Sequence, residues 1–200
     1  MPAGILLVDK PQGLTSHDVV ARIRRIAGTR KVGHAGTLDP MATGLLILGV
    51  ESATRLLHYI VGLDKEYLAT IRLGFASSTD DAEGELSEPA NPAVLASIGH
   101  GDIAAEVQKL TGDILQVPSS VSAIKVDGKR AYAKVRAGEA VELKARPVTI
   151  QEFAIDTIRR TETDIEVDVR VVCTSGTYIR ALARDLGRAL EVGGHLTMLR

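Results

Sequence analysis

The sequence predicts an α+β protein, because patterns typical of strands and patterns typical of helices both occur and neither dominates. Residues 165–173 alternate between apolar and polar side chains, as expected for a strand with one buried face. Residues 179–190 carry apolar side chains at the spacing of a helix. The chain of 200 residues is 45% hydrophobic and 24% charged, which is ordinary for a soluble globular protein.

The N-terminal part is expected to begin with a strand and a helix. Residues 4–9 form a short apolar run that predicts a buried strand. Ser16 is a favourable N-cap for the helix that follows, which has one apolar stripe and ends at Gly28. The apolar run 45–50 predicts a second buried strand, and residues 66–73 predict a third.

Besides the strand at 165–173, the remainder of the chain is expected to contain a polar loop, two helices and one irregular insertion. Residues 77–92 are polar and acidic, and they predict a loop or lid. Apolar residues at positions 103, 107 and 110 predict a helix that ends before Gly112. Residues 116–142 are rich in Ser, Gly, Lys and Arg and have weak periodicity, which is typical of an insertion. The last helix is expected to end at the glycines 193 and 194.

Residue types and their spacing exclude several classes of site. The single Cys173 leaves no internal disulfide and no cysteine-built metal site, and it suits a reducing compartment. The five histidines have no paired spacing, so we expect no metal ion. No apolar stretch approaches the roughly 18 residues of a membrane span, and no signal-peptide pattern is present. We therefore expect a cytoplasmic protein without membrane attachment and without a cofactor.

Charge is unevenly distributed along a chain whose net charge is only −1. Residues 80–106 carry seven acidic side chains and no Lys or Arg. Residues 16–36 carry five basic side chains, and residues 125–146 carry seven against three acidic ones. Two interpretations stay open: a positive face that binds phosphates, or solvated loops whose charges cluster by chance.

The turn around Asp39 is the most informative part of the chain. Residues 33–44 read GHAGTLDPMATG, which sets one carboxylate among small residues, with His34 five positions before it. Asp39 precedes a proline, and this dipeptide favours a turn. On turn chemistry alone, Asp39 serves to cap backbone amides. A lone carboxylate can also catalyse a reaction if an arginine keeps it oriented and ionised.

Three further side chains have both a structural and a functional interpretation. Arg180, near the start of the last helix, is the best placed partner for Asp39, although it is also compatible with an exposed helix arginine. Tyr67 and Tyr178 can each bury a ring in the core or present it to a nucleic-acid base.

Five ordered segments together resemble the TruB family of tRNA pseudouridine synthases. They are the opening motif GILLVDKPQGLTS, the aspartate motif GHAGTLDPMATGLLILGVESATR, the tyrosine motif KEYLATIRLGFASSTDDAEGE, the insertion QVPSSVSAIKVDGKRAYAKVRAGE, and the closing motif SGTYIRALARDLGRAL with HLTMLR. The resemblance implies the pseudouridine synthase fold, a mixed and largely antiparallel sheet flanked by helices, with an inserted RNA-gripping segment. It also implies isomerisation of uridine to pseudouridine in the T arm of tRNA, at position 55.

The resemblance also assigns roles to individual residues. Asp39 is expected to be the catalytic nucleophile, Arg180 its partner, and Tyr67 the ring that stacks on the target base. Whether Asp39 attacks the sugar or the base, or assists a glycal route by taking a proton, stays open. His34, Tyr178 and Leu199 are expected to contact the flipped-out nucleotide or line its pocket. Several basic side chains of the insertion are expected to contact the RNA backbone: Lys125, Lys129, Arg130 and Lys134.

The resemblance leaves the organisation of the chain and one rival function to be tested. We expect one catalytic domain over residues 1–200, with an insertion at about 115–145. Bacterial members usually continue into a small RNA-binding PUA domain, which this chain is expected to lack because it stops at Arg200. The rival is a non-catalytic module that binds or folds tRNA on the same scaffold. The compact chain favours a stand-alone monomer over a relative that depends on a guide RNA.

Overall fold

The computed structural model describes residues 3–119, 125–126, 129–130 and 143–200. The chain divides into two compact units, which are described separately below. Unit 1 comprises residues 1–64 and 198–200, and unit 2 comprises residues 65–197. Both units combine antiparallel strands with helices, so the predicted α+β class is confirmed. Within the described ranges, no helix is long and apolar enough to cross a membrane.

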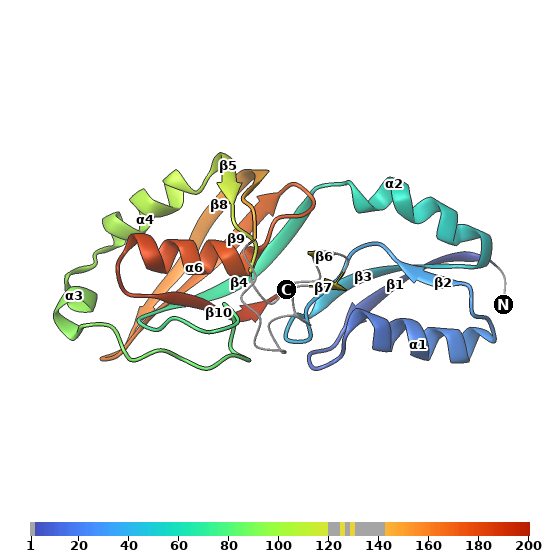
Figure 1. Ribbon diagram of the computed structural model, residues 1–200, viewed down its shortest axis with the longest axis horizontal. Coiled ribbons are helices and arrows are strands. Elements are labelled where there is room, and N and C mark those ends of the chain that lie inside the picture. Colours follow the sequence, from blue (N-terminus) through green and yellow to red (C-terminus); the bar gives the residue numbers. More distant parts are fainter. Residues whose placement is uncertain (1–2, 120–124, 127–128, 131–142) are drawn as a thin grey trace. The chain divides into compact units, whose positions relative to one another are not determined.

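Unit 1 is built on a three-stranded antiparallel sheet with the order β1-β3-β2. Its elements are β1 (Gly4–Lys10), α1 (Ser16–Ala27), β2 (Val32–His34), β3 (Gly44–Val50), the 3₁₀ helix η1 (Glu51–Leu56) and α2 (Leu57–Val61). Helix α1 runs alongside this sheet (Figure 1) and supplies Val19 and Val20 to the core of the unit. The predicted end of α1 is confirmed, because Gly28 takes the left-handed conformation with φ 64°.

Strands β1 and β3 are buried on one face only, which corrects the prediction of two fully buried strands. Leu46 and Leu48 face α1 and are almost completely buried. On the opposite face, Leu7 is 70% exposed and Leu45 is 62% exposed. A continuous apolar run is therefore no proof of burial on both faces here.

Unit 2 contains a five-stranded sheet with the order β10-β4-β9-β8-β5. Its strands are β4 (Lys65–Leu73), β5 (Gly112–Gln116), β8 (Arg146–Arg160), β9 (Ile165–Cys173) and β10 (Gly194–Leu199), the last of which ends within the residues of unit 1. A separate pair is formed by β6 (Lys125–Val126) and β7 (Lys129–Arg130). Strand β9 lies at the centre, and every second residue from Ile165 to Cys173 is buried, as its alternation predicts.

The helices of unit 2 are α3 (Pro92–Ser97), α4 (His100–Lys109) and α6 (Ile179–Ala189). Helix α4 packs against β8, and α6 packs against β4 (Figure 1). Gly187 of α6 allows the chain at the start of β10 to pass closely, because an added Cβ would lie 2.2 Å from the backbone of Gly193 and Gly194.

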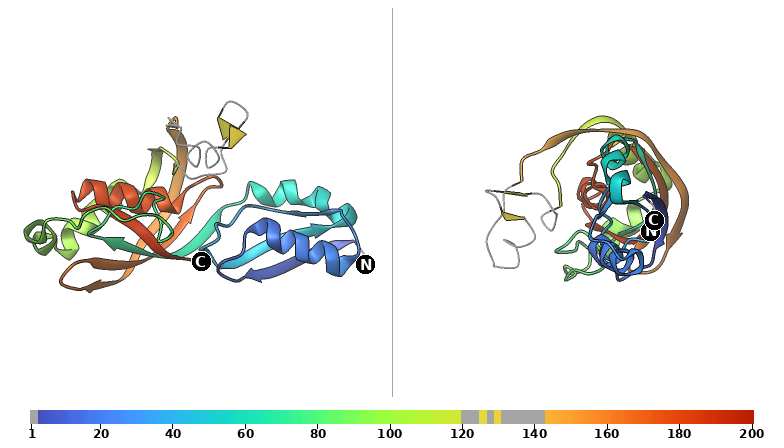
Figure 2. Two further views of the ribbon diagram at one scale, coloured as in Figure 1. Left: turned by 60° about the horizontal axis from the view of Figure 1, so that its bottom comes forward. Right: turned by 90° about the vertical axis from the view of Figure 1, so that its right-hand side faces the viewer.

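Strand β8 was not predicted, although it is the longest strand of the described chain. Its pairing with β9 shifts register twice, between Ile150 and Glu152 and between Ile155 and Thr157. Each shift breaks the two-residue alternation that reveals a strand in a sequence. Figure 2 shows β8 bending strongly along its length, as bulges are known to cause.

Candidate active site

Asp39 lies in a half-buried turn between β2 and β3, as its sequence predicts. The carbonyl oxygen of Asp39 accepts a hydrogen bond from the Ala42 amide at 3.1 Å, which closes the turn. Gly36 and Gly44 enclose this segment, and their φ angles of 113° and 107° are ones that L side chains rarely adopt. The backbone therefore requires two of the three glycines of the segment 33–44, Gly36 and Gly44.

Lys10 holds the residue that follows Asp39. Its side chain is fully buried, and its ammonium group donates to the carbonyl oxygens of Leu14 at 2.7 Å, Pro11 at 3.1 Å and Pro40 at 3.3 Å. The Gly13 amide donates to the same Pro40 oxygen at 2.8 Å. A buried ammonium is tolerated only where such acceptors compensate its lost hydration. The opening segment and the aspartate turn are thus one hydrogen-bonded structure.

His34, at the end of β2, is half-buried, and its ring orientation is fixed. Nδ1 lies 2.6 Å from the carbonyl oxygen of Gly36, and the ring of His17 packs edge-on against it at 5.4 Å. Because a carbonyl can only accept, Nδ1 carries the hydrogen, and Nε2 of the neutral ring is an acceptor. Burial lowers the pKa of His34, with the Gly36 carbonyl opposing this effect, so the ring is mostly neutral at neutral pH.

Within unit 1, the backbone of Leu199 binds the end of the aspartate loop that leads into β3. Its side chain is buried, and its carbonyl oxygen accepts from the Thr43 amide at 2.9 Å. The next residue, Arg200, forms a two-pronged ion pair with Asp9, with both nitrogen–oxygen distances 3.0 Å. This pair lowers the pKa of the Asp9 carboxyl.

The two predicted tyrosines lie on the ordered framework of unit 2, and both are half-buried. Tyr67 lies on β4 opposite Val171 of β9. Tyr178 is the N-cap residue of α6. Its backbone is hydrogen-bonded by the side chain of Gln116, which the sequence analysis did not identify. The amide of Gln116, only 2% exposed, accepts from the Tyr178 N–H at 2.8 Å and donates to the Tyr178 carbonyl at 3.0 Å.

Arg180 is buried, which rules out the exposed helix arginine that its position also allowed. One guanidinium nitrogen lies 3.1 Å from a carboxylate oxygen of Asp81 and 3.0 Å from the carbonyl oxygen of Thr79. Both side chains of the Arg180–Asp81 pair are about 5% exposed. Asp81 was missed because it belongs to a polar loop 99 residues away in sequence and no local pattern distinguishes it. The pairing of Arg180 with Asp39 stays a prediction.

Arg184, one helical turn after Arg180, connects α6 to the end of β5 and to the acidic loop. It donates to the carbonyl oxygen of Val117 at 2.7 Å and pairs with Asp80 at 3.3 Å. Burial raises the pKa of Asp80, an effect that hydrogen bonding from Ser119 and the charge of Arg184 oppose. The first residues of the predicted insertion, 115–119, are therefore ordered: they end β5 and are fixed to α6, which corrects the predicted start of the insertion.

The predicted RNA-backbone contacts lie in that insertion. Lys125 belongs to β6, and Lys129 and Arg130 belong to β7. Lys134 and most of the insertion lie outside the described residues. The role of these four side chains remains a prediction.

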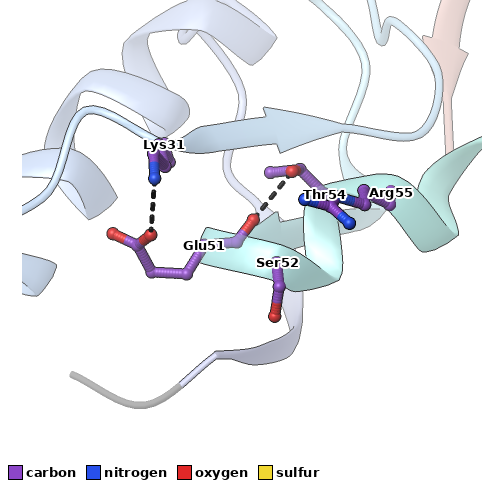
Figure 3. Close-up of a pocket in the computed structure, with 5 residues that line it drawn as sticks. All are labelled: Lys31, Glu51, Ser52, Thr54 and Arg55. Carbon is purple, nitrogen blue, oxygen red and sulfur yellow. Dashed lines mark hydrogen bonds and ion pairs between the residues drawn. The ribbon is translucent and has the colours of Figure 1, made fainter.

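Unit 1 also has an open cavity of about 430 Å³, which Lys31, Glu51, Ser52, Thr54 and Arg55 line. The Glu51 carboxylate lies 3.6 Å from the Lys31 ammonium, and the Glu51 carbonyl accepts a hydrogen bond from the Thr54 hydroxyl; Figure 3 marks both contacts. None of the predicted site residues lines this cavity, so we assign it no part in the candidate site. Across the described part of the chain, no cluster of three or more His, Cys, Asp or Glu side chains could hold a metal ion.

Comparison with known proteins identifies the family. Residues 24–179 match the model of the TruB family of pseudouridylate synthases, in its N-terminal domain. The chain belongs to the TruB family. That match contains Asp39, Tyr67 and Tyr178, and it ends one residue before Arg180.

The TruB relatives match nearly the whole chain, but the chain does not span their full length. It is 66% identical over 99% of its length to tRNA pseudouridine synthase B of Leifsonia xyli subsp. xyli, and 64% identical over its full length to that of Arthrobacter sp.. It covers 66% and 65% of these two relatives. Among solved structures, a Cbf5-Nop10-Gar1 complex contains a chain that is 31% identical, with a TM-score of 0.72; the match covers 98% of this TruB chain and 47% of that one.

Proposed function

We propose that this protein isomerises uridine to pseudouridine in tRNA. Its membership of the TruB family supports this most directly, since the matched region contains the whole aspartate motif. The reaction breaks the bond from ribose C1′ to uracil N1 and forms a bond from C1′ to C5; C5 loses its proton, and N1 takes one up. No electron is gained or lost, so the chemistry needs no redox cofactor.

Asp39 is the proposed catalytic residue, acting at the ribose or at the base of the target nucleoside. Its turn is suited to this role, because the carbonyl oxygens of Asp39 and Pro40 are both hydrogen-bonded and the turn is closed by glycines. A fixed carboxylate loses little energy to reorganisation when charge develops on the substrate. Arg180 is the proposed partner that keeps Asp39 ionised.

The remaining site residues are proposed to receive the flipped-out base. Tyr67 offers a half-buried ring for stacking. Tyr178 and Leu199 are proposed to line the pocket for the base. His34 presents Nε2 as a hydrogen-bond acceptor to the RNA. Extruding a stacked base costs a few kcal/mol, and phosphate contacts of the basic insertion, Lys125 to Lys134, are proposed to offset that cost.

The substrate is proposed to be the T stem-loop of tRNA, with position 55 as the target, and the enzyme is proposed to act as a cytoplasmic monomer. Incubating a tRNA transcript labelled with tritium at uracil C5 tests the chemistry, because C5 loses that tritium when pseudouridine forms. Mapping the modified base in the same transcript tests the position. Binding of tRNA without tritium release would favour the rival function, a non-catalytic tRNA-binding module.

The role of Asp39 is tested by Asp39→Asn, which keeps the shape of the side chain and removes its charge. We expect this variant to release no tritium while its Kd for tRNA changes by less than about threefold. Asp156→Asn is the matched control, because Asp156 is exposed on β8 and outside the proposed site. Substantial turnover by Asp39→Asn would contradict the assigned role.

A further inference from the structure

Ser16 makes two hydrogen bonds to the residue just before Asp39. The side chain of Ser16 is buried, with 1% of the residue exposed. Its hydroxyl donates to the Leu38 carbonyl at 3.2 Å and accepts from the Leu38 amide at 2.9 Å. A single hydroxyl therefore fixes the two peptide groups that flank Leu38, one of which is the peptide bond to Asp39.

This contact is separate from capping of helix α1, which corrects the prediction that Ser16 is the N-cap. The N-cap is Thr15, whose hydroxyl accepts from the Asp18 amide at 3.1 Å, while the Asp18 carboxylate accepts from the Thr15 amide at 2.8 Å. This reciprocal pair satisfies the exposed helix terminus. The Ser16 hydroxyl is thus directed to the aspartate turn, 22 residues further along the chain.

Asp39 is consequently held from both sides. On one side, Ser16 binds both backbone groups of Leu38. On the other side, the Lys10 ammonium and the Gly13 amide bind the carbonyl oxygen of Pro40. These partners all come from the opening segment of the chain, so its contribution to the site is to fix the backbone on which the carboxylate is mounted.

We propose that Ser16 is a positioning residue for catalysis, acting through the Leu38 backbone to hold the Asp39 carboxylate in its reactive orientation. This inference rests on the proposed function, since it assigns to Ser16 the orientation of that catalytic group. Small misplacements of a catalytic group are costly, because a shift of about 1 Å can lower a rate by roughly a hundredfold. Ser16 therefore governs turnover without touching the RNA.

The test compares two hydroxyls that are adjacent in sequence. Ser16→Ala and Ser16→Cys remove the strong hydrogen bonds to Leu38, and the cysteine variant keeps the volume filled. Thr15→Ala is the matched control, because it removes a hydroxyl from the same helix terminus and costs about 1 kcal/mol by losing the cap. We expect kcat for pseudouridine formation to fall about 10- to 100-fold in both Ser16 variants, with Kd for tRNA within about twofold. Thr15→Ala is expected to lower Tm and to keep kcat within about twofold.

Equal kcat in wild type and Ser16→Ala, or an equal loss of kcat in Thr15→Ala, would overturn the proposal. Hydrogen exchange of the Leu38 amide gives a second measurement that does not depend on activity. That amide should exchange faster in Ser16→Ala and at the wild-type rate in Thr15→Ala. If the wild-type protein forms no pseudouridine, the proposed function fails, and the Leu38 amide still decides whether Ser16 fixes the turn.

Discussion

Gln116 offers a direct test of how the start of helix α6 is held. Its buried side-chain amide makes both hydrogen bonds with the backbone of Tyr178, at 2.8 and 3.0 Å. Gln116→Leu keeps a similar volume and removes both bonds. The net loss is about 1 kcal/mol for each bond, with a further cost of roughly 1 kcal/mol or more where a buried backbone group is left without its partner. We expect the free energy of unfolding to fall by about 3 kcal/mol.

Urea titration and thermal melting measure this loss. For a chain of this size, about 3 kcal/mol corresponds to a decrease in Tm of roughly 6 to 12 °C. Gln108→Leu is the matched control, because Gln108 is exposed on α4 and its replacement is expected to change stability by less than about 0.5 kcal/mol.

Gln116→Glu separates the two hydrogen bonds by pH. The introduced carboxyl keeps an acceptor for the Tyr178 amide, and it can donate to the Tyr178 carbonyl only when it is protonated. Burial next to a carbonyl raises the pKa of that carboxyl in the folded state, so its stabilising contribution is present at low pH and is lost as the pH rises. The deficit relative to wild type should therefore shrink on acidification. If Gln116→Leu proved as stable as the wild-type protein, the reasoning would be refuted, because the two hydrogen bonds of the Gln116 amide would then contribute nothing to stability.

Three further predictions concern RNA binding, packing and acid stability. Replacing Lys129 and Arg130 with Ala should weaken tRNA binding and reduce the slope of log Kd against log salt concentration by about one to two units. Filter binding at several salt concentrations measures this slope, and an unchanged slope would place both side chains outside the tRNA interface. Gly187→Ala should lower Tm, because the added Cβ would lie 2.2 Å from the backbone at the start of β10. This clash should outweigh the better helix propensity of alanine, about 1 kcal/mol. An unchanged Tm would show that the backbone at the start of β10 shifts to make room. Hydrogen bonds from Arg159 lower the pKa of Asp168 in the folded protein. The ionised Asp168 carboxylate therefore stabilises the fold at pH values above its unfolded-state pKa, and this contribution is lost as the pH falls through its folded-state pKa. Asp168→Asn should therefore flatten the decrease of Tm in acid, and an unaltered pH profile would contradict that assignment.

The sequence predicted the elements whose pattern is local and regular. The alternation of residues 165–173 identified β9, and the apolar stripes identified α1, α4 and α6. Strand β8 escaped because two shifts of register break its alternation. Strand β10 escaped because the glycines 193 and 194 indicate the end of a helix and give no sign of a new strand.

The candidate site was predicted through family resemblance more than through physical pattern. Turn chemistry alone placed Asp39 in a tight turn, which the structure confirms, and it offered no means of finding what holds that turn. Lys10, Ser16 and Asp81 are ordinary residues in the sequence, and each acquires its role from a partner between 22 and 99 residues away. Such distant pairs depend on the completed fold, so a single sequence does not reveal them.

The alignment of β1 with β3 has a consequence for how the protein must fold. In this alignment Lys10 lies opposite Gly44, and its ammonium is directed inward to the chain that carries Asp39. Since neighbouring residues of a strand point to opposite faces, a slip by one residue would turn Lys10 toward solvent and bring an apolar neighbour inward. Correct pairing of these two strands is thus a precondition for the role proposed for Asp39, and molecules with a shifted register should be inactive even when their sheets have formed.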